Sequence, residues 1–396
     1  MSDRPVGAVT REGPLIYLLA GEPSGDLLGG RLMAALKTAT GGAVRFMGVG
    51  GPAMQAQGLE SQFPMAELSV MGIVEVLPHA RLLFRRMREA AAAVDNAVPD
   101  AVVTIDAPAF AHGVAKRIRN KNIPRIHYVA PQLWAWRPWR VHKFKRHFDH
   151  LLALLPFEPE WFARYGVDCR FVGHPVVESE VADADGAAFR ARYEIAPNGQ
   201  AICVLPGSRQ GEVARLAEPF RDTLLQLQER NPDLIAVVPT VANVAECVRE
   251  ATTSWPIRTV IVEDRAEKFS AMAACNVGLA ASGTVTLELA LSGVPFVVAY
   301  KLSPVTYFLG RPLFHISYIN LINLTAGAEI VPEYIQSKCN PAALCAGVSR
   351  LLEGEGAAQV AAMQPALEQL GAGSVVPSRR AADAILDIIG EATGAA

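Results

Sequence analysis

The sequence lacks the features that would assign it to several large classes of protein. Its six cysteines are scattered and form no C-x-x-C pair of the kind used in zinc and redox sites. Its eight histidines show no H-E-x-x-H or similar spacing. The net charge of -2 provides no general attraction for nucleic acid. We therefore expect no metal and no nucleic-acid partner, and we interpret the cysteines as buried free thiols.

Long unbroken hydrophobic runs are also missing. The best candidate for a membrane span, residues 276–300, is interrupted by Glu288, Gly293 and Pro295 among others, so we predict a buried strand, helix and strand there. Residues 1–13 carry charges and lack the apolar core of a signal peptide. We expect a cytoplasmic protein. Hydrophobic residues nevertheless make up 51% of the chain, which leaves contact with a membrane surface open.

Short β-rich apolar runs alternate with helical patterns along the whole chain. This alternation is typical of parallel sheets with helical crossovers and predicts the α/β class. A length of 396 residues is sufficient for two domains. We expect strands at 15–20, 44–49, 101–105, 125–129, 151–155 and 170–172, and then at 201–205, 234–238, 259–262, 277–280 and 296–299.

A polar segment between Glu178 and Gln200 predicts the junction between two sheets, because it holds Asp, Gly and Pro and no long apolar stretch. We expect one domain over residues 1–178, a second over 200–375, and a C-terminal helix within 376–396 that packs back on the rest. Two open sheets joined in this way place a site in the cleft between the carboxyl ends of their strands.

The loop from Gly21 to Asp26 joins the first expected strand to a helix expected over 27–37. Its glycines allow a ligand to approach the backbone, and Glu22, Ser24 and Asp26 offer polar contacts at a helix N-terminus. The spacing differs from the dinucleotide fingerprint, the phosphate loop of nucleotide triphosphatases and the nucleophile elbow of hydrolases. A tight turn that merely caps the helix is the alternative interpretation.

Asp106 directly follows the expected strand 101–105. A carboxylate that emerges from a buried strand is partly desolvated, which raises its pKa and suits a general base acting on a sugar hydroxyl. The alternative is an aspartate that caps the following helix.

Residues 127–146 combine tryptophans with arginines and lysines. Such a cluster suits stacking on a sugar or binding a phosphate, and we take Trp136 and Arg137 as candidate substrate contacts. The same composition would suit RNA. It would equally suit an amphipathic helix with tryptophans in the core and cations in solvent.

Two loops in the second half predict a site for a nucleoside diphosphate. One follows strand 201–205 and supplies Arg209, and the other begins a helix that carries Glu288. A helix N-terminus and Arg209 would bind the phosphates, and Glu288 would bind ribose hydroxyls. A structural Glu288 with satisfied partners is the alternative. The candidate residues are Gly207, Ser208, Arg209, Ser282, Gly283, Thr284 and Glu288.

The order and spacing of these loops resemble the lipid-A-disaccharide synthase family, whose members are glycosyltransferases with two Rossmann-like domains facing across a cleft, the GT-B architecture. The resemblance covers almost the whole chain. The segments that carry it are 21–26, 51–54, 70–76, 105–108, 134–137, 173–175, 205–209 and 282–284.

The resemblance implies that UDP-2,3-diacylglucosamine is joined to 2,3-diacylglucosamine 1-phosphate (lipid X) through a β-1,6 bond, with release of UDP and without metal or cofactor. It implies Asp106 as the base, Glu22, Ser24 and Asp26 as an active-site loop, and Asn323 as a substrate contact. It also suggests a homodimer that exchanges C-terminal segments. The chain departs from the family where the family usually has Asp and Arg, at Ala109 and Ala328.

Both substrates of that family carry acyl chains, so we expect peripheral contact with the cytoplasmic face of the inner membrane. An apolar segment that starts at Val70 is followed at once by a basic rim, which suits an anionic lipid surface. An ordinary core helix is the alternative. The residues expected at the membrane are Leu82, Leu83, Phe84, Arg85 and Arg86.

Two other functions stay open at this point. A UDP-sugar 2-epimerase of similar build would use the same nucleotide site without binding acyl chains. A protein that binds lipid or nucleotide without catalysis would need the same fold but no base at Asp106.

Overall fold

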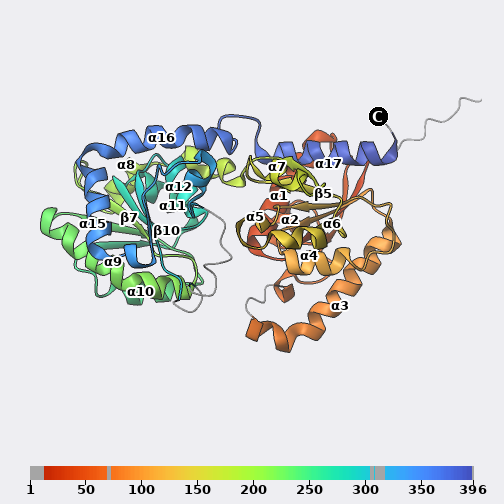
Figure 1. Ribbon diagram of the computed structural model, residues 1–396, viewed down its shortest axis with the longest axis horizontal. Helices are drawn as coiled ribbons and strands as arrows, with labels where there is room; N and C mark the ends of the chain where they lie inside the picture. The colour runs from red at the N-terminus through yellow and green to blue at the C-terminus, as the bar shows by residue number, and fades with distance from the viewer. Residues whose placement is uncertain (1–12, 69–72, 304–306, 308–316, 395–396) are drawn as a thin grey trace, which may run out of the picture. The chain divides into compact units, whose positions relative to one another are not determined.

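The computed structural model describes residues 13–68, 73–303, 307 and 317–394. Within these ranges the chain forms two parallel sheets of six strands each. The sheets belong to two compact units, one built from Met1–Pro175 with Val375–Ala396 and the other from Val176–Ser374 (Figure 1). The expected α/β class with two parallel sheets is confirmed.

The sheet of the first unit has the strand order β2-β1-β3-β4-β5-β6. Helices cover both of its faces, so β1, β3 and β4 are almost completely buried, although β4 includes Arg125 and His127. The strands are β1 (Leu15–Ala20), β2 (Arg45–Val49), β3 (Ala101–Ile105), β4 (Arg125–Tyr128), β5 (His150–Ala153) and β6 (Asp168–Phe171).

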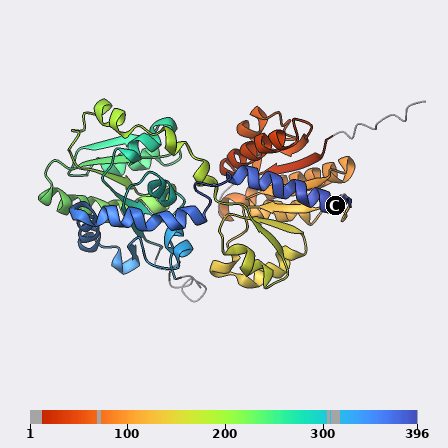
Figure 2. The ribbon, with the colours of Figure 1, turned by 90° about the horizontal axis from the view of Figure 1, so that it is seen from above.

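The C-terminal helix α17 (Pro377–Thr393) belongs to the first unit and packs along α1 (Figure 2). Its apolar face, which includes Ala381 and Ile385, is buried in the core of that unit. The other helices of the unit are α1 (Pro23–Ala39), α2 (Pro52–Ala56), α3 (Ile73–Ala97), α4 (Pro108–Ala115), α5 (Leu133–Trp136), α6 (Val141–Lys145) and α7 (Glu158–Ala163).

The sheet of the second unit has the strand order β12-β11-β10-β7-β8-β9. Its strands are β7 (Ala201–Leu205), β8 (Ile235–Pro239), β9 (Thr259–Val262), β10 (Val277–Ala281), β11 (Phe296–Tyr300) and β12 (Glu333–Ile335). Its helices are α8 (Gly186–Arg192), α9 (Gln210–Arg230), α10 (Ala245–Thr252), α11 (Lys268–Ala273), α12 (Val285–Leu291), α14 (Leu321–Ala326), α15 (Pro341–Arg350) and α16 (Gly356–Gln369).

The polar segment expected to join the domains packs as part of the second unit. Its helix α8 buries Phe189 and contacts α11. The backbone N–H of Asp185 donates to Ser270 Oγ at 3.0 Å, and the Arg190 guanidinium donates to the carbonyl of Ala274 at 2.8 Å. The boundary between the units therefore lies at the start of this segment, after Pro175.

The hydrophobic stretch near residue 280 is divided between β10, α12 and β11, as its interruptions predict. Among the described residues, no helix is both long and apolar enough to cross a bilayer.

Candidate functional site

The two motifs of the first unit lie side by side because their strands are neighbours. Strand β1 pairs with β3 in parallel, with Ala20 opposite Ile105. Gly21 and Asp106 therefore leave the sheet at the same edge. A Cβ atom at Gly21 would lie only 2.9 Å from the Cβ of Ala107, so glycine permits this close approach.

Asp106 sits in an unusual backbone conformation. Both Asp106 (φ 51°) and Ala107 (φ 45°) are left-handed, although neither is glycine. Such residues cost about 1–3 kcal/mol each and persist where surrounding structure imposes them, often at functional sites. The N–H of Asp106 donates to the carbonyl of Tyr128 at 3.0 Å, which ties the turn to β4.

The Asp106 carboxyl has the chemistry of a base. Burial raises its pKa above the usual aspartate value, and a hydrogen bond from the Ala107 backbone partly offsets that rise. The N-cap of α4 is Ala107, so the alternative in which Asp106 caps this helix is wrong. Ala109, a departure from the family, is exposed in the first turn of α4.

Asp26 has a structural role. Its buried carboxylate accepts hydrogen bonds from the backbone N–H groups of Gly51 (2.8 Å), Ala53 (2.9 Å) and Met54 (3.0 Å). These groups form the N-terminus of α2, so Asp26 fixes that helix on α1. The prediction of a loop up to Asp26 is wrong. Helix α1 starts at Pro23, because proline is well suited to a first helical position.

The motif leaves two polar side chains beside the Asp106 turn. Glu22 is the N-cap residue of α1 and is partly buried, and Ser24 is exposed in the first turn. Glu22 and Ser24 are therefore the members of the motif that suit contacts with a ligand near Asp106.

The tryptophan-rich segment is fixed by a carboxyl group that the sequence analysis did not identify. Trp134 Nε1 donates to Glu158 Oε1 at 3.0 Å, and Glu158 Oε2 accepts from the backbone N–H groups of Leu154 and Leu155. Glu158 is 1% exposed, and burial raises its pKa to about 7. Trp136 is 37% exposed, with the Arg137 guanidinium 3.9 Å from its ring centroid.

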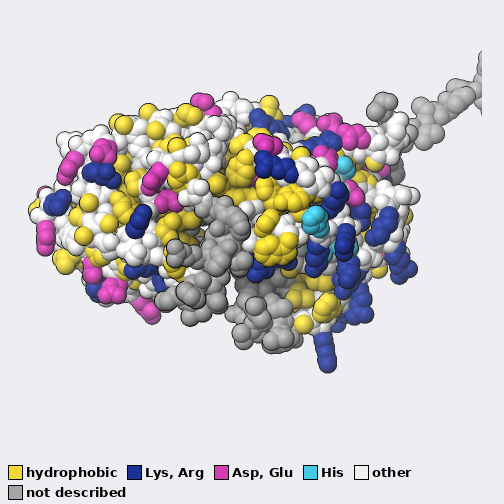
Figure 3. All heavy atoms as spheres, viewed as in Figure 1, with side chains coloured by type: hydrophobic (Ala, Val, Ile, Leu, Met, Phe, Trp, Pro, Cys, Tyr) yellow, Lys and Arg dark blue, Asp and Glu magenta, His cyan; other side chains and the backbone are white. Residues whose placement is uncertain are grey.

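The chain from Asp106 to Asp149 contains ten Lys and Arg residues and no other acidic residue. Figure 3 shows Lys and Arg side chains gathered over α3, α4 and α6 of the first unit. The cations of the tryptophan segment are thus part of a wider basic surface.

All seven residues of the expected nucleotide site line one pocket of about 360 Å³ in the second unit. The pocket lies where β7, β8 and β10 end and the loops to their helices begin. Gly207 has a φ of 126°, and a Cβ atom there would lie 2.6 Å from the Cβ of Glu212. Glycine is therefore required for the turn that presents Ser208 and Arg209.

The pocket holds two pairs of opposite charges. Arg209 Nη1 lies 2.9 Å from Glu212 Oε1, and the Lys268 ammonium forms an ion pair with Glu288 Oε2. Glu212 also accepts from the Ser208 backbone at 3.2 Å. Glu212 and Lys268 were not predicted from the sequence. Arg209 and Glu212 are three residues apart at the start of α9, and this spacing could have indicated Glu212 from the sequence.

Asn323 is occupied within the protein. It is fully buried, and its Nδ2 donates to the carbonyl of Val331 (2.7 Å) and to Glu333 Oε1 (2.9 Å). Its Oδ1 accepts from the backbone N–H groups of Ile330 and Val331. All four hydrogen-bonding positions of the amide are used to hold the chain before β12. None is left for a ligand, so the expected substrate contact of Asn323 is wrong. Ala328, the other departure, is exposed.

The expected membrane segment is helix α3 in part. Residues 69–72 and the side chains of 73–79 lie outside the described residues. Phe84 is 52% exposed, whereas Leu83 packs against the core. An open groove of about 690 Å³ is lined by Arg81, Leu82, Phe84, Arg85, Arg88 and Arg117.

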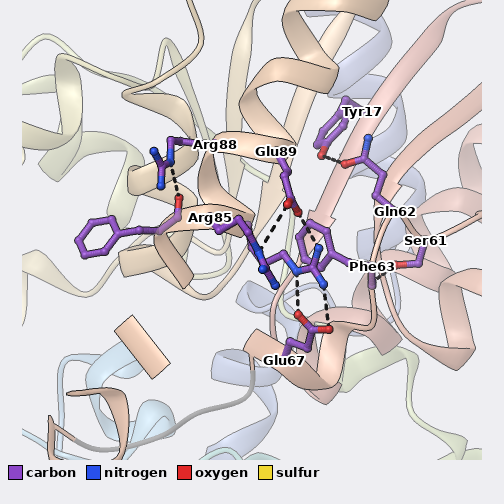
Figure 4. Close-up of polar contacts among 10 residues, drawn as sticks. Tyr17, Ser61, Gln62, Phe63, Glu67, Arg85, Arg88 and Glu89 are labelled. Carbon is purple, nitrogen blue, oxygen red and sulfur yellow. Dashed lines mark hydrogen bonds and ion pairs between the residues drawn. The ribbon is translucent and has the colours of Figure 1, made fainter. Parts of the chain in front are cut away.

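Arg86 is less exposed than Arg85, which also lies 3.6 Å from Glu89 but keeps 59% of its side chain exposed. Arg86 binds Glu67 at 2.7 Å and Glu89 at 2.6 Å, and Figure 4 shows Glu67 and Glu89 converging on the arginine side chains of α3. The expectation that Arg86 faces lipid is corrected, because its charge is used to join α3 to the turn that contains Glu67. Within the described ranges, no three His, Cys, Asp or Glu side chains come together as metal ligands.

Two solved structures resemble this one in fold. The UDP-GlcNAc 2-epimerase from Neisseria meningitidis bound to UDP-GlcNAc matches with a TM-score of 0.59 at 12% identity, covering 95% of this chain and 99% of that one. Acinetobacter baumannii MurG matches with a TM-score of 0.58 at 14% identity, covering 95% and 100%. At these identities the likeness shows the fold alone, so it gives the epimerase alternative no further support.

The sequence comparisons are more specific. A family model described as lipid-A-disaccharide synthetase matches residues 16–385. The lipid-A-disaccharide synthase of Rhodospirillum centenum is 50% identical over 379 residues, covering 95% of this chain and 94% of the relative. That of Paramagnetospirillum magneticum is 48% identical over 381 residues, covering 95% and 97%. The chain therefore belongs to the lipid-A-disaccharide synthase family of glycosyltransferases.

Proposed function

We propose that the chain is an inverting glycosyltransferase that condenses UDP-2,3-diacylglucosamine with lipid X to give the β-1,6-linked disaccharide 1-phosphate and UDP. Family membership supports the reaction. The observation that carries the assignment of roles is the Asp106 carboxyl, which is held in a strained turn and has a raised pKa.

Asp106 acts as the general base in this proposal. Its carboxylate takes the proton of the acceptor 6-hydroxyl while that oxygen forms a bond to C1 of the donor sugar. The bond from C1 to the diphosphate oxygen breaks, and its electron pair leaves with UDP. One displacement inverts the anomeric carbon. Burial raises the affinity of Asp106 for a proton, which favours the transfer.

The donor nucleotide binds in the pocket of the second unit. The N-terminus of the 21-residue helix α9 and the Arg209 guanidinium contact the diphosphate and stabilise the charge that develops on UDP. Ser282 and Thr284 offer hydroxyl groups, and Glu288 accepts from the ribose hydroxyls. Arg209 is 72% exposed on its side chain, so it can exchange Glu212 for a phosphate.

The acceptor sugar binds on the first unit. Glu22 and Ser24 contact it beside Asp106, and Trp136 with Arg137 provides a stacking surface. Asp26 contributes by positioning, because it holds the N-terminus of α2.

We propose that the enzyme contacts the cytoplasmic face of the inner membrane through the arginine-rimmed groove on α3. Arg81, Arg85, Arg88 and Arg117 meet anionic headgroups, and Phe84 inserts between acyl chains. This peripheral contact gives the enzyme access to two acylated substrates. We also propose a homodimer, which a size measurement in detergent would test.

An assay with both radiolabelled lipid substrates tests the reaction. We expect a disaccharide and UDP in equal amounts, and no sugar product when lipid X is omitted. Conversion of UDP-diacylglucosamine alone into another UDP-sugar would instead support an epimerase. Binding of both lipids without turnover would support a protein with no catalytic role.

A further inference from the structure

Lys268 is a partly buried cation of the pocket in the second unit, and the nucleotide contacts proposed above do not include it. It is the first residue of α11, and it forms an ion pair with Glu288 of α12. The two side chains are 25% and 16% exposed, and both line the pocket. The pair therefore joins two helices at the place where the proposed ribose contact lies.

The Glu288 carboxylate has few partners besides Lys268 among the described residues. Its neighbours Leu287 and Leu289 are completely buried. Its Oε2 atom is buried too and, apart from the ion pair with Lys268, has no hydrogen-bond partner among the described residues. Burying a carboxylate without a partner costs free energy. Lys268 removes that cost and restricts the directions in which the carboxylate can point.

The second ion pair of the pocket is built differently. The side chain of Arg209 is 72% exposed, whereas that of Lys268 is 25% exposed. Glu212 keeps a hydrogen bond from the Ser208 backbone, so it stays satisfied in part when Arg209 turns to a phosphate. Glu288 Oε2 would lose its described partner if Lys268 moved away. Lys268 is therefore better suited to holding its carboxylate than to leaving it for the diphosphate.

We propose that Lys268 is a positioning residue that holds the Glu288 carboxylate in the orientation that accepts hydrogen bonds from the ribose hydroxyls of the donor nucleotide. This inference rests on the proposed nucleotide site. It assigns ribose recognition to the pair of Lys268 and Glu288, and diphosphate recognition to Arg209 and the N-terminus of α9.

Calorimetric titration with UDP and with 2′,3′-dideoxy-UDP tests the inference. Hydrogen bonds to a charged group change affinity about ten- to hundred-fold, so the full-length protein should bind UDP more tightly than the dideoxy nucleotide by that factor. Lys268→Met should weaken UDP binding about ten-fold or more while changing dideoxy-UDP binding less than about two-fold. Lys268→Arg should restore most of the preference. Lys338→Met, at an exposed lysine outside the pocket, should leave both affinities unchanged.

Two variants guard against a folding defect. Lys268→Met leaves a carboxylate without its cation, and the double variant Lys268→Met with Glu288→Gln removes both charges. The double variant should show the same weak preference for ribose as Glu288→Gln alone, because the two residues act as one unit. Thermal unfolding without nucleotide identifies any variant that loses its structure.

Each remaining outcome has a separate meaning. If Lys268→Met lowered the affinities for UDP and for dideoxy-UDP equally, Lys268 would contact the phosphates and the inference would be overturned. An unchanged preference for ribose in Lys268→Met would overturn it as well. If the wild-type protein bound no UDP, the proposed nucleotide site itself would fail, and the role of Lys268 with it.

Discussion

The same edge of a parallel sheet carries different chemistry in the two units. At the end of β3 in the first unit, burial raises the pKa of Asp106. At the ends of the strands in the second unit, Glu212 and Glu288 are each paired with a cation. A desolvated carboxyl is prepared to take up a proton, and paired charges are prepared to receive an anion. One architecture therefore provides the two tasks that a glycosyl transfer needs.

The backbone conformation at the two sites also differs between the units. The first unit holds the non-glycine residues Asp106 and Ala107 in a left-handed conformation, and the second uses Gly207 for its own unusual turn. The turn at Asp106 is therefore strained, whereas glycine allows the turn at Gly207 to form without that cost. The following changes test this contrast, from the largest expected effect to the smallest.

Asp106→Asn should lower turnover by about two to four orders of magnitude, because the variant cannot accept the proton of the acceptor hydroxyl. UDP binding, measured by calorimetry, should change less than two-fold, since the nucleotide site belongs to the other unit. The control is Asp387→Asn, at an exposed aspartate of α17, which should keep full turnover. Undiminished turnover in Asp106→Asn would remove Asp106 as the base.

Asp26→Ala should lower the free energy of unfolding by about 2–3 kcal/mol, because three backbone N–H groups at the start of α2 lose their acceptor. Chemical denaturation measures the change, with Asp387→Ala as the control. A variant that kept its stability but lost turnover would contradict the structural role and assign Asp26 to the chemistry beside Asp106.

Arg209→Ala should weaken UDP binding about ten-fold, because a charge-assisted contact to the diphosphate is lost. Arg249→Ala provides a matched control, since Arg249 is also paired with a glutamate in the second unit but lies outside the pocket. If both variants bound UDP equally well, the pocket would not be the diphosphate site.

Phe84→Ser should weaken sedimentation with anionic vesicles about three- to ten-fold, because a half-exposed aromatic ring no longer inserts into the lipid. Leu225→Ser, at an exposed leucine of the second unit, should have no effect. Replacing Leu82, Leu83 and Phe84 together would also disturb the core through Leu83, so the single change is the cleaner experiment. Equal vesicle binding by Phe84→Ser and the wild type would reject the groove as the membrane contact.

The strands could be predicted mainly from short apolar runs such as β1, β3 and β7, although β4 also contains Arg125 and His127. All eleven expected strands are present, and β1, β3, β7 and β9 have the expected bounds. Strand β12 was missed since it has only three residues, begins with Glu333 and is buried only in part. The start of α1 was misplaced because a motif of polar residues was taken for a loop, although Pro23 indicated a helix start.

The candidate residues that could be predicted lie in the loops and first helical turns that follow strands, as Asp106, Arg209 and Glu288 do. Asp106 and Arg209 were found for that reason. Lys268 and Glu158 carry no motif of their own, and their partners lie far from them along the chain. Lys268 is separated by twenty residues from Glu288, and Glu158 by twenty-four from Trp134. Such pairs arise when crossover helices bring different loops together, which depends on the packed fold and not on local spacing.

The pH dependence of kcat/KM tests the central claim, that the Asp106 turn creates the base. Burial raises the pKa of Asp106, and only the ionised carboxylate can accept a proton. The rate should therefore be constant at high pH and fall about ten-fold per pH unit below a pKa that lies above the usual aspartate value. The pH at which kcat/KM begins to fall should change when Asp106 is replaced by Glu. A rate that stays constant down to the usual aspartate pKa, or a fall that begins at the same pH after the substitution, would contradict the account.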